Sequence, residues 1–319
     1  MRILIQCSRA LRVVGLMLLL CAPASAISID WTPVDDPGND CDTQSQGCFG
    51  KVDYGYQIAT YEVTNEQYTA FLNAVADTDA NALYHTDMGT GLGGIERSGS
   101  PGSYAYSATD GREALPVNYV SWYDALRFAN WLHNGQLDTG AQSAVTTEDG
   151  SYTFSGTTTV GARNANATIV LPNENEWYKA AYYAAGSTSY FDYPAGFDLQ
   201  TVCFTPSALP NTATCNGSGG GLQDVGSYTG AASPYGTFDQ GGNVWEWTET
   251  ADGATQVMRG GSYATNAANL AAASRISNFA GTQDSWFGFR VAAVPEPGTG
   301  LLVAVGMLGL CGWRRRKGG

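Results

Sequence analysis

Three short segments near the end of the chain constrain its fold more than any other feature. Residues 241–247 read Gly-Gly-Asn-Val-Trp-Glu-Trp, residues 259–263 read Arg-Gly-Gly-Ser-Tyr, and residues 287–290 read Phe-Gly-Phe-Arg. Glycine lets backbone segments approach closely, and tryptophan combines a large apolar area with one N–H donor. We therefore expect the three segments to form the floor of one packed polar site. The alternative is an ordinary buried core in which Glu246 is satisfied by hydrogen bonds.

Three earlier segments precede these in order: residues 61–68 (Tyr-Glu-Val-Thr-Asn-Glu-Gln-Tyr), 115–122 (Leu-Pro-Val-Asn-Tyr-Val-Ser-Trp) and 171–177 (Leu-Pro-Asn-Glu-Asn-Glu-Trp). The ordered set lies within residues 52–294 and resembles the formylglycine-generating enzyme family, also called the sulfatase-modifying factor domain. The resemblance implies a single α+β domain related to C-type lectins. Such a domain is loop-rich, with short antiparallel strands and about three main helices.

Helix signals in the body agree with this fold. A capping box pairs an N-cap side chain with a polar side chain three residues later, and the chain has three candidates. These are Thr64 with Gln67, Ser121 with Asp124, and Asn173 with Glu176. We expect the second helix to end at His133 as a positive residue favourable to the helix C-terminus. A strand is predicted from Tyr54 to Tyr61, hairpins over residues 139–170, and an irregular leader over residues 27–51.

The N-terminal segment, residues 1–26, is predicted to be a secretory signal peptide. It has three arginines, an apolar run from Val13 to Cys21, and Ala-Ser-Ala at 24–26. This order is typical of a cleaved leader. A retained membrane anchor is the alternative, although the apolar run is short for spanning a bilayer.

Cysteine use agrees with export. Two of the seven cysteines lie in the signal segment and one in the tail, which leaves Cys41, Cys48, Cys203 and Cys215 in the body. Four cysteines allow three pairings, of which the local one, 41 with 48 and 203 with 215, is the simplest. Zinc is a poor alternative because the body has no Cys-x-x-Cys spacing and the chain has only two histidines.

The C-terminal segment, residues 295–319, combines Pro-Glu-Pro, an apolar run from Leu301 to Trp313, and Arg-Arg-Arg-Lys. It resembles the PEP-CTERM sorting signal of Gram-negative bacteria, which a membrane transpeptidase called exosortase recognises. The resemblance implies a transient inner-membrane anchor, its basic end cytoplasmic, followed by delivery to the cell surface or extracellular matrix. A plain single-span anchor is the alternative.

Charge excludes one class of partner. The chain has 16 Lys and Arg against 29 Asp and Glu, and seven of the basic residues lie in the two terminal segments. The body is therefore strongly acidic and lacks the basic surface that displaces counterions from nucleic acid. We expect no nucleic-acid partner.

The family's enzymes oxidise a sulfatase cysteine to formylglycine with copper and molecular oxygen, and two cysteines after Gly-Gly-Ser-Tyr hold the Cu(I). Thr265 and Leu270 stand at the corresponding positions here, and no cysteine lies between residues 215 and 311. The resemblance places Trp245 and Ser262 in the family's oxygen pocket, and we add Arg290 to this predicted pocket. We expect no copper, and the sequence favours a protein that is not an enzyme. Formylglycine generation is the alternative.

The resemblance also implies one structural calcium site, with ligands from Asp239, Gly242, Val244 and Glu246. Each residue offers an oxygen atom, the ligand that Ca²⁺ requires. The alternative is that Glu246 binds Arg259 or Arg290 instead. A second calcium site of the family, expected within residues 203–224, has no match.

Together, these features predict an exported, surface-sorted protein that uses the domain as a rigid scaffold for binding or for matrix structure. Its ligand would be a surface polysaccharide or protein. Tyrosine-rich loops suit recognition because aromatic side chains give contact area at low entropic cost.

Overall fold

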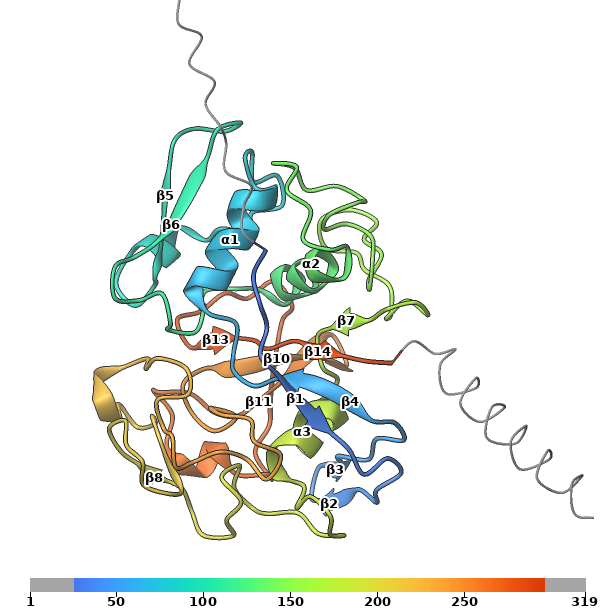
Figure 1. The fold of residues 1–319 in the computed structure, drawn as a ribbon, viewed down its shortest axis with the longest axis vertical. Helices are drawn as coiled ribbons and strands as arrows, with labels where there is room; N and C mark the ends of the chain where they lie inside the picture. The colour runs from blue at the N-terminus through green and yellow to red at the C-terminus, as the bar shows by residue number, and fades with distance from the viewer. Residues whose placement is uncertain (1–25, 296–319) are drawn as a thin grey trace, which may run out of the picture.

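The structure is a computed structural model that describes residues 26–295 (Figure 1). Residues 1–25 and 296–319, which hold the predicted signal peptide and sorting tail, lie outside the described residues. The helices are α1 (Asn65–Val75), α2 (Trp122–His133) and α3 (Glu174–Tyr182), with short 3-10 turns η1 (Thr86–Gly89), η2 (Ser218–Gly220) and η3 (Ala267–Leu270). The strands are β1 (Trp31–Val34), β2 (Asp42–Gln44), β3 (Gly47–Phe49), β4 (Tyr56–Ala59), β5 (Ile95–Ser98), β6 (Ala105–Ala108), β7 (Ile169–Val170), β8 (Val202–Cys203), β9 (Thr212–Ala213), β10 (Trp245–Asp252), β11 (Thr255–Arg259), β12 (Ile276–Asn278), β13 (Phe287–Gly288) and β14 (Ala292–Ala293).

Two four-stranded sheets organise the described chain. In the first, β14 from the end of the domain lies between β4 and β7, with β1 at the edge beyond β4. In the second, the strand order is β12-β11-β10-β13, and β13 runs parallel to β10 with Phe287 opposite Trp245. Across the antiparallel pair β10–β11, Glu246 lies opposite Arg259. The three C-terminal sequence segments therefore meet on neighbouring strands, as expected.

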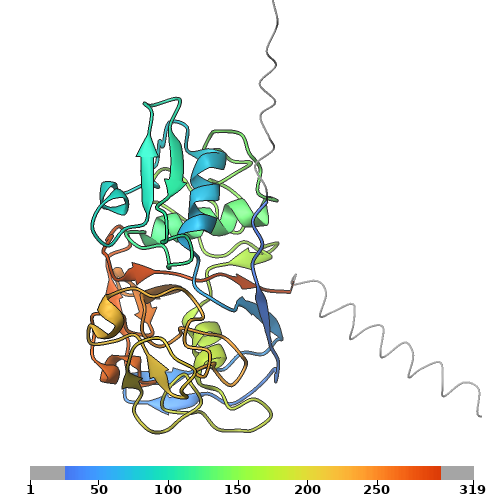
Figure 2. The same cartoon turned by 60° about the vertical axis from the view of Figure 1, so that its left-hand side comes forward.

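The three predicted helices form with their predicted caps. Thr64, Ser121 and Asn173 each close a capping box at the start of α1, α2 and α3. Helices α1 and α2 lie together at one end of the molecule beside the β5–β6 hairpin, whereas α3 lies toward the other end (Figures 1 and 2). The loop-rich α+β architecture predicted from the family resemblance is confirmed.

Aromatic packing fixes α1 against α2. The rings of Tyr68 and Phe128 stack with centroids 6.0 Å apart, and Phe289 contacts Phe128 edge-on at 5.4 Å. Phe289 belongs to the Gly-Phe-Arg segment that follows β13. The last segment of the sequence thus helps to anchor the two-helix end of the domain.

Two expectations about irregular regions are wrong. Residues 27–51 are not an irregular leader, because β1 adds an edge strand to the first sheet and β2 pairs with β3. Pro33 is tolerated in β1 because an edge strand leaves one row of backbone groups unpaired. Residues 139–170 do not form regular hairpins; one bridge joins Phe154 to Val160, and β7 pairs only with β14.

The side chain of Asn130 explains the second difference. Its amide donates to the carbonyl oxygens of Thr147 and Tyr152 and accepts from the Tyr152 N–H. A buried side chain on α2 therefore satisfies backbone groups that a hairpin would have paired. His133 ends α2 as expected, but burial lowers its pKa and its Nδ1 accepts from the Thr168 N–H. Both features oppose the positive charge expected at this helix end.

Candidate functional site

A tight turn over residues 239–243 leads into β10. Asp239 and Asn243 have left-handed backbone conformations, with φ of 59° and 56°. A Cβ atom on Gly242 would lie 2.3 Å from the carbonyl oxygen of Thr214, so only glycine fits there. The Asn243 amide donates to Glu62 Oε2 over 3.0 Å and ties the turn to the segment before α1.

Glu246 and Arg290 form a fully buried ion pair beneath this turn. Arg290 Nε donates to Glu246 Oε2 over 2.6 Å, and Arg290 Nη2 donates to Oε1 over 2.7 Å. The indole N–H of Trp177 on α3 adds a third hydrogen bond to Oε2 at 2.8 Å. Arg259, the other partner considered from the sequence, binds Glu174 instead, with Nε donating to Oε1 over 2.8 Å.

Two more buried carboxyl groups, Glu62 and Asp239, lie close to this pair. Burial raises the pKa of Glu62 well above its usual range, and repulsion from Asp239 and Glu246 adds to the effect. Burial likewise raises the pKa of Asp239 to about 6, although the Gly226 N–H and Arg290 oppose the shift. Three carboxyl groups thus share one guanidinium, and the cluster carries an excess of negative charge when they are ionised.

The predicted calcium ligands are gathered by this turn, but their oxygen atoms have other partners. Glu246 is engaged by Arg290 and Trp177, and Asp239 Oδ2 accepts from the Gly226 N–H over 2.6 Å. Asp239 also lines a cavity of about 20 Å³, room for roughly one water-sized particle. Within residues 26–295, no three His, Cys, Asp or Glu side chains gather as a metal-binding group. Calcium at Asp239, Gly242, Val244 and Glu246 stays a prediction, and its donor set is chemically suited to a hard cation.

The two positions that the family resemblance assigns to copper ligands, 265 and 270, hold a local turn and a buried aliphatic group. Thr265 Oγ1 accepts from the Ser262 N–H over 2.8 Å and donates to the Ser262 carbonyl oxygen over 3.1 Å. Leu270 is fully buried and packs with Ala213 and Cys215. These groups offer no thiolate, so they do not fit copper. Trp245 is buried against the main core rather than exposed in an open pocket.

Disulfides join Cys41 to Cys48 and Cys203 to Cys215. The Cys203–Cys215 disulfide places a sulfur atom in the cluster around Leu270, because Cys215 packs there and is fully buried. In the disulfide neither sulfur is a thiolate. Sequence spacing did not reveal this proximity, since residues 215 and 270 meet only in the folded chain.

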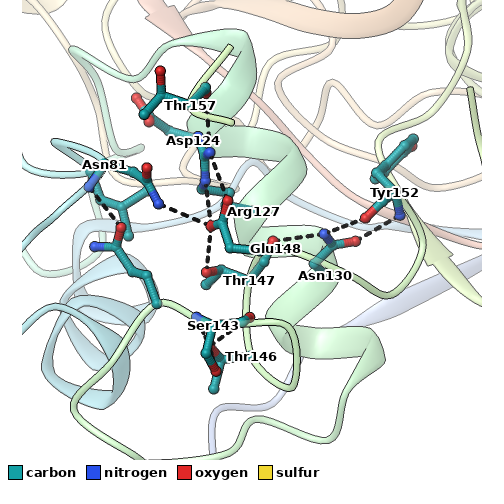
Figure 3. A network of polar contacts seen from close by, with 12 residues as sticks. Asn81, Asp124, Arg127, Asn130, Ser143, Thr146, Thr147, Glu148, Tyr152 and Thr157 are labelled. Atoms are coloured by element: carbon teal, nitrogen blue, oxygen red, sulfur yellow. Dashed lines mark hydrogen bonds and ion pairs between the residues drawn. The ribbon is translucent and has the colours of Figure 1, made fainter. Parts of the chain in front are cut away.

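A second candidate site, which the sequence did not single out, lies beside α2. We call it the α2 cavity: a space of about 330 Å³ lined by residues of α2, by Asn81, by the loop at Thr157, and by Gln283. Figure 3 shows four of the lining residues, Asn81, Asp124, Arg127 and Thr157, within a polar network in which Arg127 and Asn81 both donate to Glu148. The sequence signal for this site is Asp124 and Arg127 on a helix face that also carries Phe128, but the capping box alone accounts for Asp124.

Comparisons with known proteins agree with the sequence resemblance. Residues 50–294 match the sulfatase-modifying factor enzyme 1-like domain, and residues 293–317 match the PEP-CTERM protein-sorting motif. The sorting motif implies processing by exosortase and sorting to the cell surface. Within the described residues, helices long and apolar enough to cross a membrane are absent.

Similarity to individual proteins is more distant. The chain is 25% identical over 262 residues to serine/threonine-protein kinase pkn1 of Chlamydia caviae, and 24% identical over 259 residues to the protein of that name from Chlamydia pneumoniae. These matches cover 75% of this chain but span only about a third of the relatives' length.

Two solved structures share the fold. Treponema denticola variable protein 1 has a TM-score of 0.55 and 19% identity, covering 86% of this chain and 98% of its own. CarF has a TM-score of 0.51 and 23% identity, covering 84% and 99%. Because the domain match spans most of the described chain and the architecture agrees, the chain belongs to the sulfatase-modifying factor enzyme 1-like domain family and carries a C-terminal PEP-CTERM sorting signal.

Proposed function

We propose that this protein is a non-catalytic member of its family, a rigid exported scaffold that binds a ligand at the cell surface or in the extracellular matrix. One observation carries the proposal: Thr265 and Leu270, which the family resemblance assigns to the positions of the copper thiolates, carry no sulfur and are both used structurally. A redox site without soft ligands cannot hold Cu(I). The buried ion pair and the two disulfides supply the rigidity that a binding scaffold needs.

A peptide assay tests the absence of catalysis. Purified protein is incubated with copper, oxygen and a cysteine peptide of the sulfatase type, and aldehyde is trapped with a hydrazide. We expect none from the natural sequence. The double variant Thr265→Cys, Leu270→Cys serves as the matched control, because it returns two sulfur atoms to this position. Aldehyde formation by the natural chain would refute the proposal.

A formylglycine-generating oxidase is the second candidate, and one observation favours it: the Cys203–Cys215 disulfide lies against Leu270. If this bridge were reduced, two thiols would become available beside the family's copper position. The peptide assay is therefore run before and after reduction. Turnover that appears on reduction and disappears in Cys215→Ser would establish this candidate instead.

We also propose that the turn over residues 239–243 binds structural Ca²⁺ through Asp239, Glu246 and the carbonyl oxygens of Gly242 and Val244. The excess of buried carboxyl groups over guanidinium groups supports this, because a divalent cation would offset their repulsion. A ligand at ~100 times its dissociation constant adds roughly 2.7 kcal/mol of stability. We therefore expect EDTA to lower the melting temperature, and the shift to vanish in Asp239→Ala.

Asp252→Ala, which removes an exposed acidic residue at the end of β10, is the control and should keep the calcium response. Calorimetric titration with CaCl₂ gives an independent readout that does not depend on stability. Absence of both a melting shift and binding heat in the natural protein would mean that the Arg290–Glu246 pair alone satisfies the cluster.

A further inference from the structure

The α2 cavity has the size and lining of a small-molecule site. Its volume of about 330 Å³ falls within the range of roughly 300–1,000 Å³ typical of ligand pockets. Asp124 and Arg127 are 2% and 1% exposed, yet both line it. Buried charged groups at a cavity wall are costly unless they are paired or contact a ligand.

The charges at the wall largely cancel, which favours a neutral ligand. Arg127 is neutralised by Glu148, with Nε and Nη2 donating to the two carboxylate oxygens over 2.8 Å and 2.9 Å. An anion would therefore gain little from Arg127. Burial also raises the pKa of Asp124 to about 7, so this carboxyl is partly neutral at physiological pH and offers a cation less than one full negative charge.

Several polar atoms at the wall keep unused hydrogen-bonding capacity. The Asp124 carboxyl already has partners in the Ser121 N–H, the Ser121 side chain and Gln283 Nε2. Within residues 26–295, however, Arg127 Nη1 donates no hydrogen bond, and the side-chain oxygens of Asn81 and Gln283 accept none. The wall thus offers acceptors and one donor together. Groups that both donate and accept, such as hydroxyls, match this set.

One aromatic side chain accompanies the polar wall. Tyr123 is half-buried and lines the cavity. A ring at the wall of a polar cavity gives an apolar face against which the C–H groups of a ring-shaped polyol can pack.

We propose that the α2 cavity binds a neutral saccharide unit, with its hydroxyl groups bonded to Asp124, Arg127, Asn81 and Gln283 and its apolar face near Tyr123. This inference rests on the proposed binding role of the domain and specifies its ligand class. It does not depend on the calcium cluster, which lies in the second sheet and the turn before it.

The inference is tested with an array of immobilised neutral and uronic-acid oligosaccharides. The array is probed with the full-length protein. We expect binding to neutral members, followed by titration calorimetry with the best of them. Gln283→Ala should weaken that affinity by about fivefold to tenfold, the effect of one net hydrogen bond. Tyr123→Ala, which removes the aromatic ring from the wall, should weaken it as well. Phe204→Ala, which removes an exposed phenylalanine far along the chain, is the matched control and should leave affinity unchanged.

Circular dichroism and melting temperature establish that each variant is folded before its affinity is compared. Binding to no glycan on the array, preference for uronic acids, or equal loss in Tyr123→Ala and Phe204→Ala would each overturn the saccharide inference. None of these results bears on whether the protein is an enzyme. The peptide–aldehyde assay decides that question separately, so the two proposals fail independently.

Discussion

Arg290 joins more of the domain together than any other single side chain in the site. Its Nη1 donates to the carbonyl oxygens of Ala59 and Thr60, and its Nη2 donates to that of Phe238. With the two bonds to Glu246, all five N–H donors of the guanidinium are used. Lysine could not replace this fixed planar fork.

Breaking the Arg290–Glu246 pair should therefore destabilise the folded protein strongly. We expect Glu246→Gln to lower the free energy of unfolding by about 3–5 kcal/mol, because it removes the carboxylate that makes two direct hydrogen bonds to the buried Arg290 guanidinium. Asp252→Asn, which weakens the exposed contact with Arg275, should cost less than about 1 kcal/mol. Urea unfolding of both variants measures the difference. Equal losses would show that burial of the Arg290–Glu246 pair is not what makes it important.

The raised pKa of Asp124 predicts that the stability of the protein depends on pH. Burial raises its pKa to about 7, against an ordinary value of 3.8, so the folded state binds the proton more tightly than the unfolded state. Its contribution is complete below about pH 4 and is lost as pH rises toward 7. The slope for one such proton is about −1.4 kcal/mol per pH unit.

Asp124→Asn removes this titration while keeping an oxygen that can accept from the Ser121 N–H. Urea unfolding at pH 4.5, 6.0 and 7.5 should show a flatter pH dependence in the variant. Asp239 and Glu62 have pKa values shifted in the same direction, so some slope should remain. A variant curve parallel to that of the natural protein would contradict the assignment.

At the scale of elements, each helix start is stabilised by hydrogen bonds between residues three positions apart. The Thr64 side chain accepts from the Gln67 N–H over 3.2 Å, and Gln67 Oε1 accepts from the Thr64 N–H over 3.0 Å. We expect Thr64→Ala to cost about 1 kcal/mol, whereas Thr64→Ser should keep most of the stability. Thermal unfolding of the pair checks this. An equal loss in both variants would point to lost packing of the threonine methyl group rather than to the cap.

This locality explains which elements could be predicted from the sequence. A capping box depends on residues three positions apart, so all three helix starts were predicted correctly. The edge strand β1 was missed because its partner β4 lies more than twenty residues away and Pro33 argues against a strand. The hairpins expected over residues 139–170 did not form because Asn130 binds that backbone from another element.

The candidate sites also divide into parts that the sequence predicts and parts that only the fold shows. The family motifs brought Glu246, Trp245 and Arg290 onto adjacent segments, but only the fold shows that Arg290 rather than Arg259 pairs with Glu246. The α2 cavity combines α2 with residues 81, 157 and 283. No spacing in the sequence marks such a combination, since its members come from four separate segments.

At the scale of the whole molecule, an acidic, disulfide-bonded domain precedes a sorting tail. The full chain has a net charge of −13, and seven of its 16 basic residues lie in the terminal segments, so the domain itself is acidic and disfavours polyanionic partners. The last described strand, β14, is inserted between β4 and β7, so the residues leading to the tail are held in the first sheet. A rigid domain attached in this way is suited to presentation at a surface after exosortase processing.

The most direct test of this account is the stoichiometry of Cu(I) bound to the body of the protein with both disulfides intact, measured by competition with a chromophoric chelator. The account predicts no Cu(I) bound to the natural sequence at the position of Thr265 and Leu270, and one Cu(I) bound to the double variant Thr265→Cys, Leu270→Cys. One equivalent of Cu(I) bound to the natural protein, and lost on changing residues around Ser262, would contradict it.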